Sequence, residues 1–132
     1  MAKAAIYTAN TTAAALDAGS IIPLGNTVRR FGCAVRQDGN TIALQGQGYY
    51  LITVSATLTA TAAGTLSLTA QKDGAPVIGA TASETAAAAG VVNLSVTFLA
   101  RNLCGCDSSL ISLILGGGAA TVNNVAVTAI KL

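Results

Sequence analysis

The sequence predicts an all-β sandwich or barrel of about eight to ten short antiparallel strands. Three observations support this prediction. Segments in which apolar and polar residues alternate recur along the chain, and a strand places successive side chains on opposite sides. Glycine, Asp-Gly and similar turn residues separate these segments about every ten residues. The segments are rich in Thr, Val and Ile, which favour strands over helices. At 132 residues, we expect the chain to form one domain over residues 1–132.

The clearest strand lies within residues 46–60, and we expect it to be central. After Gly48, apolar side chains fall on one side at Tyr50, Ile52, Val54, Ala56 and Leu58. The other side carries mostly hydroxyl groups. Tyr49 and Leu51 make the first part of that second side apolar, and such a side is suited to contact another subunit.

The first forty residues carry the weakest pattern. Residues 3–9 alternate and predict an opening strand. We interpret residues 10–20 as a loop, because the helical turn possible there is too short to be stable alone. Residues 20–26 are extended and form either an edge strand or an irregular strand, since Pro23 cannot donate a ladder hydrogen bond. Residues 27–37 predict one further strand, which ends at the turn residues 38–40.

The rest of the chain predicts a series of strands. Asp73-Gly74 predicts a tight hairpin turn. The alanines in residues 81–90 favour helix by propensity, but the surrounding alternation favours a loop running into a strand. Residues 110–115 are nearly all apolar, as in a strand covered on both sides. The expected strands cover residues 41–44, 65–72, 75–80, 91–101, 110–115 and 122–132.

The composition favours an oligomer and excludes some partners. Charged residues make up only 9% of the chain, whereas a soluble domain usually carries about 25%. Such a surface gives a monomer little protection against association. The net charge of +2 comes from scattered residues, so we expect no nucleic-acid partner. No apolar run approaches the ~20 residues that span a bilayer. The N-terminus lacks the pattern of a signal peptide, so we expect synthesis in the cytoplasm.

Nothing in the sequence predicts a reaction, so we expect no catalytic residue and no cofactor. The chain has no His, and its carboxylates fall mostly in predicted turns or loops. Cys33 therefore has no His to activate it. Cys104-Gly105-Cys106 invites a zinc interpretation, but a structural zinc site needs four ligands. We interpret these cysteines as reduced small residues in a turn, and we expect no metal site.

Three segments resemble a known family. Residues 41–44 precede Gly48-x-Tyr50-x-Ile52-x-Val54, a Lys72-Asp73-Gly74-x-Pro76 hairpin follows, and residues 111–115 and 127–132 form the last two strands. In this order they resemble the C1q/TNF-like jelly roll, in its bacterial and phage branch. They are similar, for example, to the C-terminal head of the collagen-like exosporium glycoprotein. The resemblance covers about residues 41–132. The chain lacks a collagen-like tail and an acidic calcium cluster, so calcium and receptor binding are not carried over.

The resemblance implies a homotrimer in which one sheet of each subunit packs around a three-fold axis. The residue pattern agrees, because apolar groups remain on the second side of several strands. A monomer would expose them as a large patch, although some could instead pack under loops. We expect four residues to contribute to the trimer contact: Tyr49, Leu51, Ile114 and Ile130.

These features predict a non-enzymatic structural protein of an assembled particle. A phage virion component, either a capsid-decoration or a head-fibre protein, fits best, and its further partner would be a capsid or surface-layer protein. One alternative is a bacterial spore- or cell-surface head. Another is a trimeric module that binds carbohydrate or a receptor. Such modules often expose aromatic platforms, whereas this chain has only three Tyr and two Phe.

Overall fold

The computed structural model describes residues 3–102 and 108–132, and within these ranges the chain is all-β. The expected strands in residues 3–9, 41–44 and 46–60 are confirmed, with small shifts of their ends. The described residues form eleven strands: β1 (Ala4–Asn10), β2 (Ala14–Leu16), β3 (Asn26–Phe31), β4 (Val35–Asp38), β5 (Thr41–Gln45), β6 (Gly48–Ala60), β7 (Gly64–Lys72), β8 (Ala75–Ala86), β9 (Val91–Asn102), β10 (Ser108–Gly116) and β11 (Ala120–Lys131).

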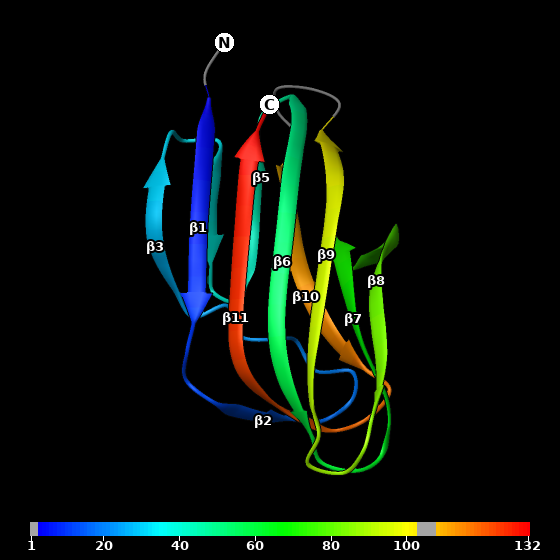
Figure 1. The fold of residues 1–132 in the computed structure, drawn as a ribbon. Helices are drawn as coiled ribbons and strands as arrows, with labels where there is room; N and C mark the ends of the chain where they lie inside the picture. The colour runs from blue at the N-terminus through cyan, green and yellow to red at the C-terminus, as the bar shows by residue number, and fades with distance from the viewer. Residues whose placement is uncertain (1–2, 103–107) are drawn as a thin grey trace.

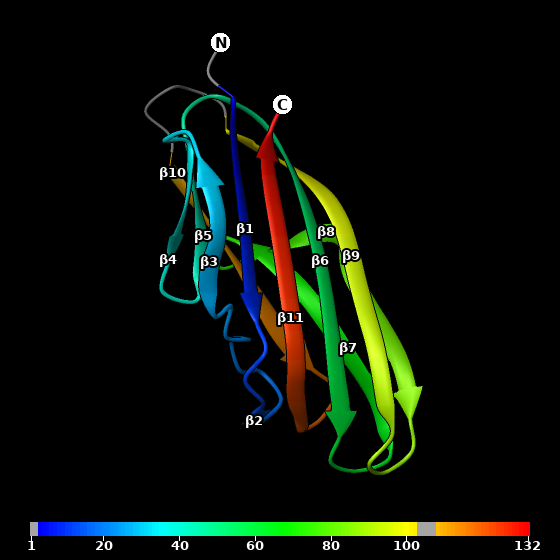
Figure 2. The same cartoon turned by 60° about the vertical axis from the view of Figure 1, so that its left-hand side comes forward.

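The strands form two antiparallel sheets that pack face to face (Figures 1 and 2). The front sheet of Figure 1 has the order β3-β1-β11-β6-β9, and the short β2 pairs with β11. The back sheet has the order β4-β5-β10-β7-β8. In both sheets, neighbours in space are often distant in sequence. The first and last long strands, β1 and β11, thus lie side by side.

The core lies between the sheets and follows the predicted alternation. The inward residues of β6 are all buried, including Tyr50 at 0% exposure. Strand β9 alternates between buried and exposed residues over its whole length. The back sheet contributes Leu68, Leu113 and Leu115. Period-2 alternation therefore assigned the inward side correctly for these strands.

The Asp73-Gly74 turn forms as predicted. Lys72 pairs with Ala75, which leaves two turn residues with positive φ angles of 53° and 84°. This is the backbone that favours Asp-Gly. The Leu110 backbone N–H donates to Asp73 Oδ1 at 2.9 Å, and the Asp73 N–H donates to the Leu110 carbonyl at 2.9 Å. The Asp73 carboxylate therefore links the turn to the neighbouring strand β10.

The single strand expected over residues 27–37 is wrong. The chain instead forms β3 in the front sheet and β4 in the back sheet. The crossing occurs at Gly32, which has a φ of 79°. A Cβ there would lie 2.7 Å from the Lys3 carbonyl oxygen, so glycine also permits a close approach of β1.

Three other segments differ from expectation. Within the loop expected over residues 10–20, β2 pairs with β11. The loop expected over residues 81–90 is strand as far as Ala86, because residues 81–86 pair with β7. Their small side chains give little hydrophobic contrast, so the alternation is hard to detect. Strand β10 is not covered along both sides, since Leu110 is 40% exposed.

Candidate interaction surface on the front sheet

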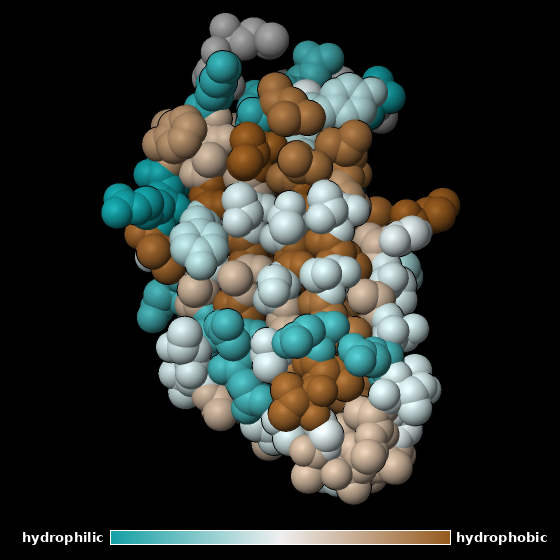
Figure 3. All heavy atoms as spheres, in the orientation of Figure 1, coloured by the Kyte–Doolittle hydropathy of each residue, from teal (hydrophilic) through white to brown (hydrophobic). Residues whose placement is uncertain are grey.

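An unbroken row of apolar side chains crosses the outward face of the front sheet. Its members pair from strand to strand: Phe31, Ala5, Ile130, Leu51 and Leu99, on β3, β1, β11, β6 and β9. Directly paired residues of antiparallel strands lie on the same side of a sheet. Phe31 is 60% exposed, Leu99 55% and Ile130 39%. Figure 3 shows hydrophobic side chains gathered over the upper part of this face. We call these five residues the apolar row.

The apolar surface continues toward the upper end of the sheet in Figure 1. Tyr49 pairs with Arg101, whose guanidinium carbon lies 5.5 Å from the centre of the Tyr49 ring. The backbone N–H of Leu132 donates to the Tyr49 carbonyl at 2.9 Å. Tyr49 and Leu132 are both exposed. Tyr49 and Leu132 therefore extend the apolar surface by one register beyond the apolar row.

Below the apolar row, the same face is polar but uncharged. Thr128, Thr53 and Thr97 occupy one register across β11, β6 and β9. Farther down, the Thr57 hydroxyl donates to Asn93 Oδ1 at 2.8 Å, and Asn123 Nδ2 donates to the Thr59 hydroxyl at 2.6 Å. These side chains hydrogen-bond to one another across strands, so part of their polar capacity is already used.

Charge is confined to the edges of this face. Strands β1, β3, β6, β9 and β11 contain no Asp or Glu. Their outward-pointing charged residues are Arg29, which pairs with Tyr7 at one edge, and Arg101 at the other edge. The middle of the face therefore presents only apolar or neutral polar groups, and little desolvation of charge opposes its burial.

The structure brings together three of the four residues predicted for the trimer contact. Tyr49, Leu51 and Ile130 lie on the outward face of the front sheet. Ile114 lies on β10 of the back sheet, where it pairs with Ile21. Sequence reasoning did not select Phe31 or Leu99. The alternation of β9 could have identified Leu99, whereas Phe31 was hidden inside a strand predicted to be continuous.

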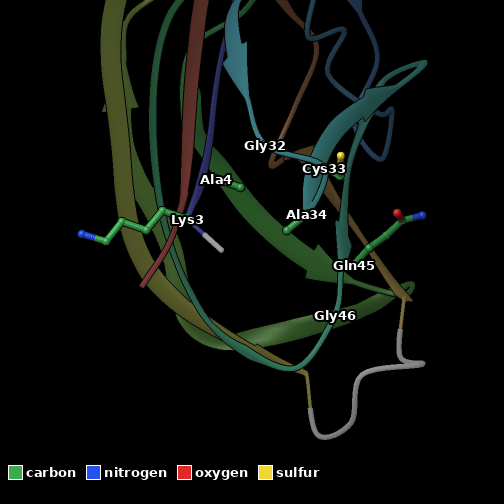
Figure 4. Close-up of a pocket in the computed structure, with 7 residues that line it drawn as sticks. All are labelled: Lys3, Ala4, Gly32, Cys33, Ala34, Gln45 and Gly46. Carbon is green, nitrogen blue, oxygen red and sulfur yellow. The ribbon is translucent and has the colours of Figure 1, made fainter. Parts of the chain in front are cut away.

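A hollow of about 490 Å³ opens at the end of the sandwich, between β1, the β3–β4 link and the end of β5 (Figure 4). Ala4 and Ala34 project into this space, whereas the Lys3 side chain points away from it. Cys33 lines the hollow and is an exposed free thiol. The lining residues include no Asp, Glu or His, and the one basic group among them, on Lys3, points away from the hollow.

The described residues offer no grouped metal ligands. Nowhere in residues 3–102 and 108–132 do three or more His, Cys, Asp or Glu side chains gather as a metal site requires. The turn expected around Cys104 and Cys106 lies outside the described residues. In the same two ranges, we find no helix long and apolar enough to cross a bilayer.

Comparison with solved structures identifies the fold. The Eiger TNF of S. frugiperda has a TM-score of 0.69 at 10% identity, over 98% of this chain and 91% of that chain. The globular domain of the zebrafish complement 1qA protein gives 0.70 at 12% identity, over 99% and 97%. The PRD1 vertex protein P5 gives 0.64 at 20% identity, over 98% and 96%.

Sequence comparison gives no further assignment, because neither a known sequence family nor a curated protein matches this chain. The structural likeness, however, extends over nearly the whole chain, including the first forty residues that sequence resemblance did not cover. The predicted fold is confirmed: the chain is a C1q/TNF-like jelly roll of two antiparallel sheets.

Proposed function

We propose that this protein is a non-enzymatic structural subunit that assembles as a homotrimer through the outward face of its front sheet. The apolar row is the observation that carries the proposal. Burying a large apolar side chain contributes about 1.5–3 kcal/mol, and Phe31, Leu99 and Ile130 each remain substantially exposed in a single copy. The row crosses all five main strands, so it forms a continuous strip.

The apolar row also meets the chemical requirements of a contact between copies. Its flanking residues are neutral hydroxyl and amide groups, and its charged residues lie at the edges. Interface centres are similarly depleted of charge and rich in aromatic and aliphatic groups. The resemblance to the C1q/TNF-like family favours three copies over two.

Within that proposal, the trimer is a component of a phage virion, displayed on it as a capsid decoration or a head fibre, and its partner is a capsid protein. A phage vertex protein is among the solved structures that share the fold along the whole chain. The low charge of the chain and its wealth of small residues also suit a protein largely covered by neighbours.

The test of the trimer is the mass of the purified protein, measured by multi-angle light scattering at micromolar concentration. We expect three times the chain mass of 13.0 kDa. A mass of one chain would contradict the proposal. For the virion role, we expect the protein to band with intact phage particles in a density gradient. Its recovery only in the soluble fraction of the lysate would contradict that role.

A second candidate is a module that binds carbohydrate or a receptor, including a head on a spore or cell surface. The observation in its favour is that three aromatic residues, Tyr7, Phe31 and Tyr49, are exposed on one face. Exposed rings can stack on sugar rings. Glycan-array binding that is lost in Tyr49→Ala, with the trimer mass unchanged, would favour this function over the structural one.

A further inference from the structure

The edge strand β8 carries an isoleucine that is completely exposed. Thr69 pairs with Thr81 and Gln71 pairs with Pro76, which leaves only Ala70 on β7 opposite residues 77–80 on β8. These extra residues form a large bulge. Ile78 within it is 101% exposed. Figure 3 shows a hydrophobic side chain that stands out from the edge formed by β8.

The bulge is anchored, so Ile78 has a defined position. On one side Ala80 is fully buried, and on the other Val77 packs against the core. Gly79 has a φ of 83°, and a Cβ there would meet nothing within 4 Å. Glycine is therefore required for the left-handed backbone and not for space. The left-handed backbone at Gly79 thus keeps the neighbouring Ile78 side chain exposed to water.

A small apolar hollow lies between β1 and β3. These strands are at the opposite edge of the molecule from β8 (Figure 1). Its volume is about 170 Å³, and its surface is nearly all carbon. A cavity of about 150 Å³ accommodates benzene, so this hollow is large enough for an isoleucine side chain. Its walls come from Ala5, Ile6, Tyr7, Arg29, Arg30 and Phe31.

The walls of this hollow are held in place. Arg30 Nε donates to the Val35 carbonyl at 2.7 Å, so its side chain is tied to the back sheet. Arg29 shares the outward side with Tyr7 and brings a positive charge to the rim. The hollow borders the apolar row, because Phe31 and Ala5 belong to both. It is therefore continuous with the proposed subunit contact.

We propose that Ile78 of one copy inserts into the β1–β3 hollow of the next copy. This inference rests on the proposed homotrimer and specifies which surfaces meet in it. Ile78 and the hollow lie on opposite edges of the same chain, so the contact is head-to-tail. Head-to-tail contacts close into a ring when the rotation between neighbouring copies permits it. A second copy is the occupant favoured here because it supplies an apolar group of the required size.

Charge substitutions at Ile78 test this contact. Light scattering over a dilution series should show that Ile78→Lys raises the trimer dissociation constant by about a hundredfold or more, because the lysine meets the rim arginine. Ile78→Asp should raise it by about tenfold, since Arg29 offsets part of the loss. Because the Ile78 side chain is fully exposed in a single copy, neither change should unfold the chain. Ile21→Lys, at another exposed isoleucine in the loop between β2 and β3, is the control and should leave the constant unchanged.

Disulfide trapping provides an independent measurement. In a background with Cys33, Cys104 and Cys106 replaced by Ser, Ile78→Cys combined with Phe31→Cys should give covalent dimers and trimers on oxidation. Ile78→Cys combined with Val28→Cys is the control, because Val28 lies roughly 10 Å farther along β3. It should give few such species.

The outcomes separate this inference from the proposed function. If the unaltered chain is a trimer, the inference is overturned by equal effects of Lys and Asp at position 78, or by failure of the Phe31 pair to cross-link. The proposed trimer would survive either result. If the unaltered chain is a monomer, both are overturned.

Discussion

The two sheets share one core but present different outward faces. On the front sheet, one register is apolar from β3 to β9 without interruption. On the back sheet, threonine hydroxyl groups pair between β7 and β8, such as Thr65 with Thr85 at 3.0 Å. Its central isoleucine, Ile114, is half covered and pairs with Ile21 from the loop between β2 and β3. The aligned apolar residues of the front sheet therefore suggest a contact with another subunit, whereas Ile114 is covered in part by its own chain.

The largest expected effect comes from charging the centre of each face in turn. Leu51 and Ile114 are both half-buried apolar residues in the middle region of their sheets. Leu51→Asp should convert the trimer to single chains of 13.0 kDa, because it places an unpaired charge within the buried row of each copy. Ile114→Asp should leave the trimer mass unchanged and cost about 1–2 kcal/mol of stability through its lost packing. Light scattering and urea unfolding measure the two effects.

The opposite pattern would reverse the assignment of faces. A trimer that survives Leu51→Asp but dissociates in Ile114→Asp would place the contact on the back sheet. Ile114 would then belong to the contact, as the sequence pattern suggested.

This pair of residues also shows what sequence could predict. Alternation located the side of each strand that faces the core, as for Ile52 and Thr53 in β6, because that side is set by backbone geometry alone. It found Leu51 and Ile114 equally outward. It could not say which sheet each strand joins, because sheet membership depends on pairing between distant segments. Only the structure could therefore show that Ile114 and Leu51 lie in different sheets.

The same limit explains the missed members of the apolar row. Ala5 is too small to mark a contact in sequence, and Phe31 lies next to the point where the chain changes sheets. Gly32 marks that point, but Gly39 and Gly74 are also glycines with positive φ that follow strands without a change of sheet. Composition and alternation predicted the architecture, whereas the apolar row could be identified only from the strand register.

A second prediction compares the buried hydroxyl groups of the two sheets. In the front sheet, Thr8 is fully buried and its hydroxyl has no hydrogen-bond partner among the described residues. In the back sheet, the Ser109 hydroxyl donates to Asn102 Oδ1 at 2.6 Å. Thr8→Val should therefore stabilise the protein by about 1 kcal/mol. Ser109→Ala should destabilise it by about 1–3 kcal/mol, because it leaves a buried acceptor without its donor.

Urea unfolding at one fixed protein concentration would measure both changes, since assembly makes apparent stability depend on concentration. Thr8→Ser is the matched control for the first, because it keeps the hydroxyl and removes only a methyl group. Destabilisation by Thr8→Val would mean that this hydroxyl has a partner, such as a buried water molecule.

The smallest expected effect concerns Tyr50, which links the front sheet to the turn that follows β5. Its hydroxyl lies 2.5 Å from the Gln45 carbonyl oxygen and 2.9 Å from the Gly46 carbonyl oxygen, and it donates to them. Burial raises the pKa of the Tyr50 hydroxyl above its ordinary value of 10.0. An ionised Tyr50 would lose its donor and would place a negative oxygen against two carbonyl groups.

The sign of the pH dependence follows from the raised pKa. Below about pH 10 the hydroxyl is protonated in both the folded and the unfolded chain, so Tyr50 adds no pH dependence there. Above that pH the unfolded chain releases the proton while the folded chain keeps it, and stability falls as pH rises. One group accounts for at most about 1.4 kcal/mol per pH unit. We expect unfolding free energies measured between pH 8 and 11 to fall more steeply for the unaltered protein than for Tyr50→Phe. The comparison removes the contributions of all other groups, because both proteins share them. Parallel curves above pH 10 would show that Tyr50 titrates alike in the two states, and that its hydroxyl is not held by the turn.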